Sequence, residues 1–165
     1  MTQSDIKYFV VIPSFDDNLS VQEICFELNQ LPLSPQQIIV LDDSIGIDCY
    51  DDLPTNALVV SPSFRLGQQR LLTHFFRHEF TKCCDPSESD LIIIMDADGE
   101  DSPLDIKKLL DDFTNERPVD LVLATRISRH STIRFRLGYA CFRFLSRLLT
   151  GETIKTGTFS ISSWR

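Results

Sequence analysis

The chain has 165 residues, 42% of them hydrophobic, which suits one domain with a sizeable core. Its formal net charge of −8 excludes general binding to nucleic acids, whose phosphates select basic surfaces. The apolar runs are far shorter than the roughly 20 residues of a membrane span, and the start does not read as a secretory signal. Five cysteines without paired spacing favour a reducing cytoplasm. We therefore expect a single cytoplasmic domain over residues 1–165.

Short runs rich in β-branched residues alternate with helical patterns along the chain. Strands are expected at residues 8–14, 37–43, 57–63, 90–98, 120–126 and 157–164. Helices are expected at residues 20–28, 68–80, 102–113 and 132–150. The strand runs are almost continuously apolar, as a parallel sheet covered on both faces requires. The pattern predicts a three-layer α/β domain with a mainly parallel central sheet.

Acidic residues follow several of the expected strands. They are Asp16, Asp17, Asp42, Asp43, Asp96 and Asp98. Ligands of open α/β sheets bind beyond the carboxyl ends of the strands, so we expect these side chains at the binding edge. Asp42 and Asp43 suit hydrogen bonds from a nucleobase or a ribose, with capping of the next turn as the alternative. Pro13 and Phe15 suit a wall against which a base stacks, with Asp17 beneath.

The segment after the fourth expected strand has the composition of a metal site. Asp96, Asp98 and Glu100 are spaced by two, so an extended chain points all three to one side. Such oxygen ligands suit Mg²⁺ or Mn²⁺, which share their coordination with a substrate phosphate. The alternative is a solvated acidic turn in which Asp101 and Asp105 favour the start of the next helix.

A basic segment stands out in this acidic chain. Residues 121–150 contain six arginines and no acidic residue, which predicts an anionic partner. The expected helix at 132–150 also interleaves arginine with aromatic residues, as helices at a membrane surface do. We expect Arg126 and Arg134 to hold an acceptor phosphate and the face of Arg136 to contact the bilayer. The alternative is a solvated helix whose arginines pair with acidic residues elsewhere.

Six segments carry a family resemblance through their order. They are VVIPSFDDN, IIVLDDS, FRLGQQRLL, IIIMDADGEDSPLDIKKLL, LVLATR and GTFSISSWR. Together they resemble family 2 glycosyltransferases, which have a GT-A-type nucleotide-diphospho-sugar transferase fold. The most similar branch is that of the dolichol-phosphate mannose synthases and related polyprenyl-phosphate glycosyltransferases. The MDAD segment is the most specific of the six.

The resemblance implies a metal-dependent, inverting transfer of a sugar from a UDP- or GDP-sugar. The implied acceptor is a polyprenyl phosphate or another membrane-associated anion at the cytoplasmic face. The implied nucleotide site comprises Pro13, Phe15, Asp17, Asp42, Asp43, Asp96 and Ala97. The implied metal ligands are Asp96, Asp98 and Glu100, and Mg²⁺ or Mn²⁺ is the implied cofactor. The implied catalytic residues are Asp96, Asp98 and Arg126, and the acceptor phosphate would contact Arg126, Arg134 and Arg136.

The sequence also departs from the family pattern. Asp16 and Asp17 replace Asn-Glu, Arg65 replaces an asparagine, and Glu100 replaces a glutamine. Two further interpretations therefore stay open: a domain that binds a nucleotide sugar without turning it over, and a phospho-receiver-like regulatory domain. Family members with lipid acceptors often continue into membrane helices, so an excised catalytic core is a further alternative.

Overall fold

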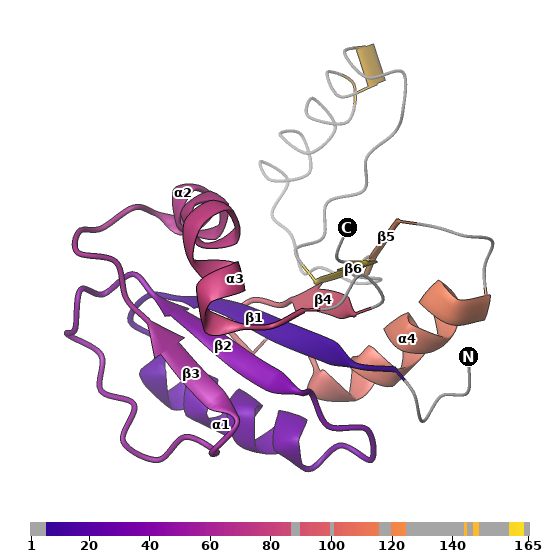
Figure 1. Ribbon diagram of the computed structural model, residues 1–165, viewed down its shortest axis with the longest axis horizontal. Coiled ribbons are helices and arrows are strands. Elements are labelled where there is room, and N and C mark those ends of the chain that lie inside the picture. Colours follow the sequence, from indigo (N-terminus) through magenta and orange to yellow (C-terminus); the bar gives the residue numbers. More distant parts are fainter. Residues whose placement is uncertain are drawn as a thin grey trace, which may run out of the picture.

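The computed structural model describes residues 6–86, 90–99, 101–115, 120–124, 144, 147–148 and 159–163. Its centre is a six-stranded sheet in the order β3-β2-β1-β4-β6-β5 (Figure 1). The strands are β1 Tyr8–Ser14, β2 Gln37–Asp42, β3 Ala57–Val60, β4 Leu91–Ile94, β5 Leu121–Leu123 and β6 Ser160–Ser163. Strands β1 to β4 are parallel, whereas β6 runs antiparallel to both β4 and β5. The mainly parallel sheet expected from the sequence is confirmed.

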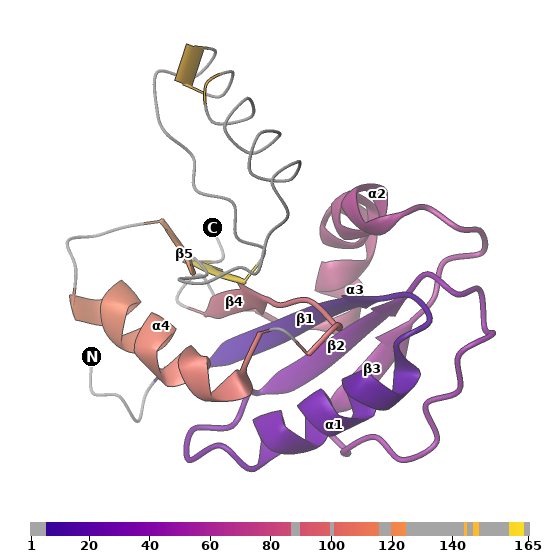
Figure 2. The ribbon, with the colours of Figure 1, turned by 180° about the vertical axis from the view of Figure 1, so that it is seen from behind.

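Helices cover both faces of this sheet. They are α1 Asn18–Asn29, α2 Gln68–His74, the π turn η2 Phe75–Glu79, α3 Phe80–Cys83, the 3₁₀ turn η3 Pro103–Asp105 and α4 Ile106–Asn115. Helices α1 and α4 lie on one face of the sheet, and α2 and α3 lie on the other (Figures 1 and 2). The predicted three-layer α/β architecture is therefore correct.

The core divides into two clusters because successive residues of β1 point to opposite faces. Tyr8, Val10 and Ile12 are buried in the cluster that includes α1 and α4. Phe9 and Val11 are buried in the cluster that includes α2, η2 and α3. All seven residues of β1 are buried, which explains its continuous apolar sequence.

The expected helix at 68–80 is interrupted by the π turn η2. In a π turn the hydrogen bonds run from residue i to i+5, so residues five apart lie on one face. Phe75 and Phe80 are both buried against the sheet as a result. The spacing of Leu71, Leu72, Phe75 and Phe76 fits a regular α-helix, so the sequence pattern did not predict this turn.

The helix starts agree with the sequence at one site and differ at another. Ser102 precedes Pro103 and its Oγ accepts a hydrogen bond from the Leu104 N–H at 3.3 Å, which caps the helical segment expected to begin at residue 102. The expected helix start at residue 20 is wrong by two residues. Helix α1 begins at Asn18, because the Asp17 carbonyl already accepts from the Val21 N–H at 3.0 Å. The expected helix at 132–150 lies outside the described residues except for Phe144, Arg147 and Leu148, which are exposed.

Phe80 provides a test of the core on the α2 face. Its side chain is fully buried and its ring contacts those of Phe9 and Phe75 edge-on, each at 5.6 Å between centroids. We expect Phe80→Ala to lower the free energy of unfolding by about 3–5 kcal/mol, because a buried aromatic side chain leaves a cavity. Urea denaturation measures the change. Phe26→Ala is the control, since Phe26 is 45% exposed and its loss should cost about 1 kcal/mol or less. Equal losses in the two variants would contradict this packing.

Candidate functional site

The carboxyl ends of the parallel strands form one edge of the sheet. The last residue of β1, Ser14, is in register with the last residue of β2, Asp42. Ile94 at the end of β4 is in register with Val11 of β1, so the segment from Met95 to Asp98 continues beside the end of β1. The acidic residues that follow these strands are therefore brought together, as the sequence predicts.

Three neighbouring carboxylates act on Asp17 at this edge. The pKa of Asp17 is raised above its ordinary value, first by partial burial and then by the negative charges of Asp98, Asp16 and Asp48. The sequence analysis missed Asp48, which lies in the loop after β2. Its Oδ2 accepts a hydrogen bond from the backbone N–H of Asp16 at 2.9 Å. Asp16 has φ 61°, a left-handed backbone conformation that aspartate adopts more readily than most other residues.

Asp42 and Asp43 are buried, being 1% and 3% exposed, and both accept hydrogen bonds from the chain itself. The two Asp42 oxygens accept from the Ser44 N–H at 2.8 Å and from the Ser61 hydroxyl at 3.0 Å. The two Asp43 oxygens accept from the N–H groups of Leu66 and Gly67, each at 2.7 Å. This pair therefore holds the loop of residues 61–67 at the site. The contact of Asp42 with Ser44 is the turn-capping role that the sequence left open. Recognition of a nucleobase and a ribose by Asp42 and Asp43 stays a prediction.

The loop 61–67 brings Arg65 over Phe15. The guanidinium carbon of Arg65 lies 3.7 Å from the centroid of the Phe15 ring, a cation–π contact. Its Nε lies 3.9 Å from Oδ2 of Asp43. Phe15 is 43% exposed, so its ring remains at the surface of the edge. Arg65 was noticed in the sequence only because it stands where the family pattern has an asparagine.

Gln68, at the start of α2, contacts the MDAD segment. Its Nε2 donates to Oδ1 of Asp96 at 2.8 Å, a contact that the sequence analysis missed. The Asp96 N–H points to Oδ2 of Asp101 at 3.3 Å. Asp101 is 7% exposed, so it supports the turn before η3 rather than lying in solvent. Asp98 is exposed, which leaves it accessible to a ligand.

The remaining predicted residues differ in how far the structure describes them. Pro13 and Ala97 are buried, and the side chain of Ala97 packs in the core cluster that includes α1 and α4. Ala97 therefore offers only its backbone to a nucleotide. The predicted residues Glu100, Arg126, Arg134 and Arg136 lie outside the described residues.

The expected metal site can be compared with the described carboxylates. Among the described residues, no group of three or more His, Cys, Asp or Glu side chains is arranged to hold a metal ion. Magnesium-type sites seldom use such a cage, because one or two carboxylates with substrate phosphates and water complete the shell. The clustering of Asp98 with Asp17, next to Asp96, fits a site of that kind. With Asp96 and Asp98 as ligands, we expect the site to bind a metal ion weakly unless a diphosphate is also bound.

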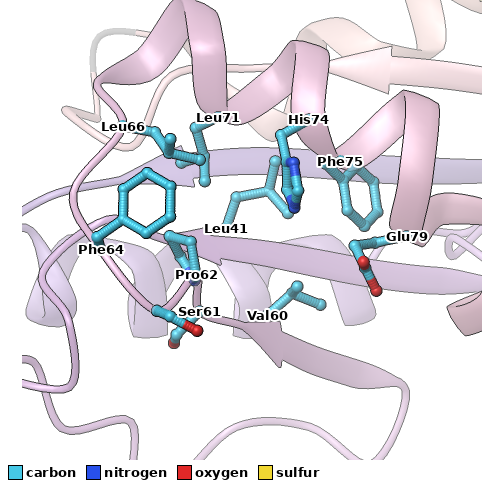
Figure 3. Close-up of a pocket in the computed structure, with 11 residues that line it drawn as sticks. Leu41, Val60, Ser61, Pro62, Phe64, Leu66, Leu71, His74, Phe75 and Glu79 are labelled. Carbon is cyan, nitrogen blue, oxygen red and sulfur yellow. The ribbon is translucent and has the colours of Figure 1, made fainter.

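A cavity of about 340 Å³ lies under α2 and η2, beside the end of β3 (Figure 3). Its apolar lining comes from Leu41, Val60, Pro62, Phe64, Leu66, Leu71 and Phe75. His74 and Glu79 reach it from the helices, and the loop 61–67 supplies Ser61 and Ser63. The same loop therefore forms a wall of this cavity and carries Arg65 to the acidic edge.

The fold is shared with known glycosyltransferases. No protein-family model and no curated protein sequence matches the chain. The crystal structure of mannosyl-3-phosphoglycerate synthase from Rubrobacter xylanophilus superposes with a TM-score of 0.67 at 17% identity, covering 98% of this chain and 54% of that one. Glucosyl-3-phosphoglycerate synthase from Mycobacterium tuberculosis, with Mn²⁺, UDP-glucose and phosphoglyceric acid, gives a TM-score of 0.65 at 18% identity, covering 98% and 57%. This chain has their fold.

The chain thus has the GT-A-type α/β fold that the sequence predicts, and it spans a little more than half the length of these structures. The receiver-like alternative is wrong, because such domains have a parallel sheet in the order 2-1-3-4-5 whereas β6 here is antiparallel. The specific likeness to dolichol-phosphate mannose synthases is not shown by these neighbours.

Asp43→Ala tests whether this carboxylate holds the loop 61–67. We expect the free energy of unfolding to fall by roughly 1–3 kcal/mol in the absence of any ligand, because two N–H groups lose their acceptor. Urea denaturation measures this loss, and Asp52→Ala at an exposed position serves as the control. A residue that only reads a base would leave the stability of the ligand-free protein unchanged.

Asp17→Asn tests the repulsion among the four carboxylates. Folding raises the pKa of Asp17, so its contribution to stability is most favourable below the unfolded value of about 3.9 and is lost as pH rises through the folded value. At pH 7 the substitution should therefore raise the melting temperature. The gain should vanish as pH falls below the unfolded value of about 3.9, where Asp17 is protonated in both the folded and the unfolded protein. Scanning calorimetry from pH 3 to 8 measures the profile, and a gain that persists at low pH would contradict the electrostatic cause.

Proposed function

We propose that this chain is the catalytic domain of a metal-dependent glycosyltransferase that moves a sugar from a nucleoside-diphosphate sugar to an anionic acceptor. The observation that carries the proposal is the acidic cluster at the carboxyl edge of a GT-A-type sheet, beside the exposed ring of Phe15. Partial burial and then the negative charges of Asp98, Asp16 and Asp48 raise the pKa of Asp17, and a cation bound here would offset this repulsion. A cation at this edge in turn attracts a diphosphate.

The donor site would lie along the ends of β1, β2 and β4. Phe15 offers a stacking surface for a base, and Asp17 lies directly after it in the chain. Asp42 and Asp43 each keep acceptor capacity beyond the two hydrogen bonds that they already accept. UDP is the favoured donor nucleotide because the Mycobacterium tuberculosis neighbour was solved with UDP-glucose, and GDP is the alternative.

Asp96 and Asp98 would hold Mg²⁺ or Mn²⁺, with Glu100 as the proposed third ligand. The neighbour solved with Mn²⁺ supports this choice of metal. A divalent cation supplies charge neutralisation for the departing diphosphate. Gln68 keeps Asp96 oriented through its 2.8 Å hydrogen bond, so the carboxylate is positioned before the ligand arrives. Inversion at the anomeric carbon stays a prediction.

The acceptor is proposed to be a phosphorylated molecule held by Arg126, Arg134 and Arg136. Both named neighbours are synthases of sugar-linked 3-phosphoglycerate, which supports a small anionic acceptor. A polyprenyl phosphate is the finer proposal from the sequence motifs. If the nucleophile is a phosphate oxygen, no strong general base is needed. A hydroxyl nucleophile requires a base that the described residues do not identify.

Contact with a membrane surface is proposed through the segment 132–150. Phe144, Arg147 and Leu148 are exposed, with Phe144 67% and Leu148 71% accessible. Exposed arginine beside exposed apolar side chains suits the headgroup region of an anionic cytoplasmic leaflet. None of the helices in the described part of the chain is long and apolar enough to cross a membrane.

Asp98→Asn tests the metal bridge. We expect the variant to bind UDP in the presence of Mn²⁺ at least about tenfold more weakly, a loss of about 1.4 kcal/mol, because one ligand of the cation is gone. Isothermal titration calorimetry with Mn²⁺ and with EDTA measures the metal-dependent part, and Asp52→Asn serves as the control at an exposed position. Equal affinity of the wild type for UDP under both conditions would contradict the metal bridge.

The same proteins, assayed with UDP-glucose or GDP-mannose, separate the remaining alternatives. Turnover with 3-phosphoglycerate supports the small acceptor, and turnover with a polyprenyl phosphate supports the lipid acceptor. Tight binding of a nucleotide sugar without turnover on either acceptor would favour the non-catalytic interpretation. Proton NMR of the product gives the anomeric configuration and so tests inversion.

A further inference from the structure

The ring of Phe15 is the aromatic surface at the acidic edge, and a side chain already lies on it. The Arg65 guanidinium carbon is 3.7 Å from the ring centroid, which is stacking distance. A planar guanidinium on an aromatic face occupies the same kind of position as a stacked nucleobase. In the ligand-free protein, Arg65 therefore covers one face of the ring on which a base is proposed to stack.

The backbone near Arg65 is fixed, whereas its side chain is not. Asp43 holds the N–H groups of Leu66 and Gly67, and Asp42 holds the hydroxyl of Ser61. The Arg65 side chain is 60% exposed and its Nε is 3.9 Å from Asp43, too far for a good hydrogen bond. The guanidinium can therefore leave the ring by rotation of its own side chain, without breaking the contacts of the loop.

The electrostatics of the edge provide a second partner for Arg65. A diphosphate brings further negative charge to a region where Asp98, Asp16 and Asp48 already repel the carboxylate of Asp17. Arg65 already forms a loose ion pair with Asp43 at this edge, with its Nε 3.9 Å from the carboxylate oxygen. Guanidinium groups bind phosphate oxygens through paired N–H donors.

Building on the proposed function, we propose that Arg65 selects nucleoside diphosphates through an exchange of partners, in which its guanidinium leaves the ring of Phe15 and binds the diphosphate. In the free protein its guanidinium covers the ring, and in the complex it binds the phosphates while the base stacks on the uncovered ring. An exposed cation–π contact is weak, so displacing it lowers the affinity for a base only about twofold to fivefold. A nucleoside has no phosphate to compensate for this loss of affinity, whereas a nucleoside diphosphate regains the affinity through the contact of its phosphates with Arg65.

The proposal predicts opposite effects of one substitution on two ligands. In Arg65→Ala, uridine should bind about twofold to fivefold more tightly, because the ring is uncovered. UDP with Mg²⁺ should bind at least about fivefold more weakly, because a charge-assisted phosphate contact is lost. Arg77→Ala removes an equal charge from an exposed position in η2 and should change neither affinity. Titration calorimetry measures both ligands with all three proteins.

A spectroscopic measurement follows the side chain directly. The Nε–Hε resonance of Arg65 should be displaced by the ring current of Phe15, and Phe15→Leu should remove that displacement. Pyrophosphate with Mg²⁺ should move the wild-type resonance towards its position in Phe15→Leu. Control titrations with Arg77 observed in the same spectra should show no such movement.

The outcomes separate this inference from the proposed function. If the wild type binds UDP but Arg65→Ala changes uridine and UDP affinity in the same direction, or changes neither, the exchange is wrong and the proposed function stands. An Arg65 resonance that pyrophosphate and UDP leave in place has the same meaning. If the wild type binds neither UDP nor GDP in the presence of Mg²⁺, the proposed function is wrong and the inference fails with it.

Discussion

Two buried carboxylates at the end of β2 determine how the rest of the edge is arranged. Asp42 and Asp43 are almost completely inaccessible, and burying a charged group is costly unless donors surround it. The chain meets this requirement with N–H and hydroxyl donors from the loop 61–67 and from Ser44. Because the donors belong to a distant loop, satisfying the carboxylates also fixes where that loop lies. Arg65 and Gln68 then reach Phe15 and Asp96 from a held backbone.

The loop after β2 contains a strained residue, Ile45, and a carboxylate, Asp48, that repels Asp17. Ile45 has φ 62°, which is unfavourable for a β-branched residue and costs on the order of 1–3 kcal/mol. It follows Ser44, whose hydroxyl accepts from the Asp48 N–H at 2.9 Å. Tyr50 in turn donates to the Ser14 hydroxyl at 3.1 Å. The loop after β2 is thus attached to the end of β1 by hydrogen bonds that keep Asp48 near Asp16 and Asp17.

The sequence predicted those features whose cause is local. Continuous apolar runs indicated the parallel strands, and Ser102 with Pro103 indicated the start of the helical segment made of η3 and α4. The order of the strands and the antiparallel direction of β6 could not be predicted, because pairing joins segments far apart in the chain. Asp43 and Gly67 are 24 residues apart and Phe15 and Arg65 are 50 apart, so no periodicity reveals these contacts. Family resemblance singled out Asp96 and Asp98, but it did not reveal Gln68 or Asp48.

The π turn between α2 and α3 has a consequence for how this segment can vary. It amounts to one residue more than a regular helix would need between Phe75 and Phe80. Deleting one residue here would place the two phenylalanines four apart, a spacing at which a regular α-helix also keeps both on one face. Phe80 and Cys84 would then still face the sheet, whereas removing a residue from a regular part of the helix would turn everything beyond it by about 100°. The π turn is therefore the place in this segment where the chain can lose one residue, such as the exposed Arg77 or His78, and keep both phenylalanines against the sheet.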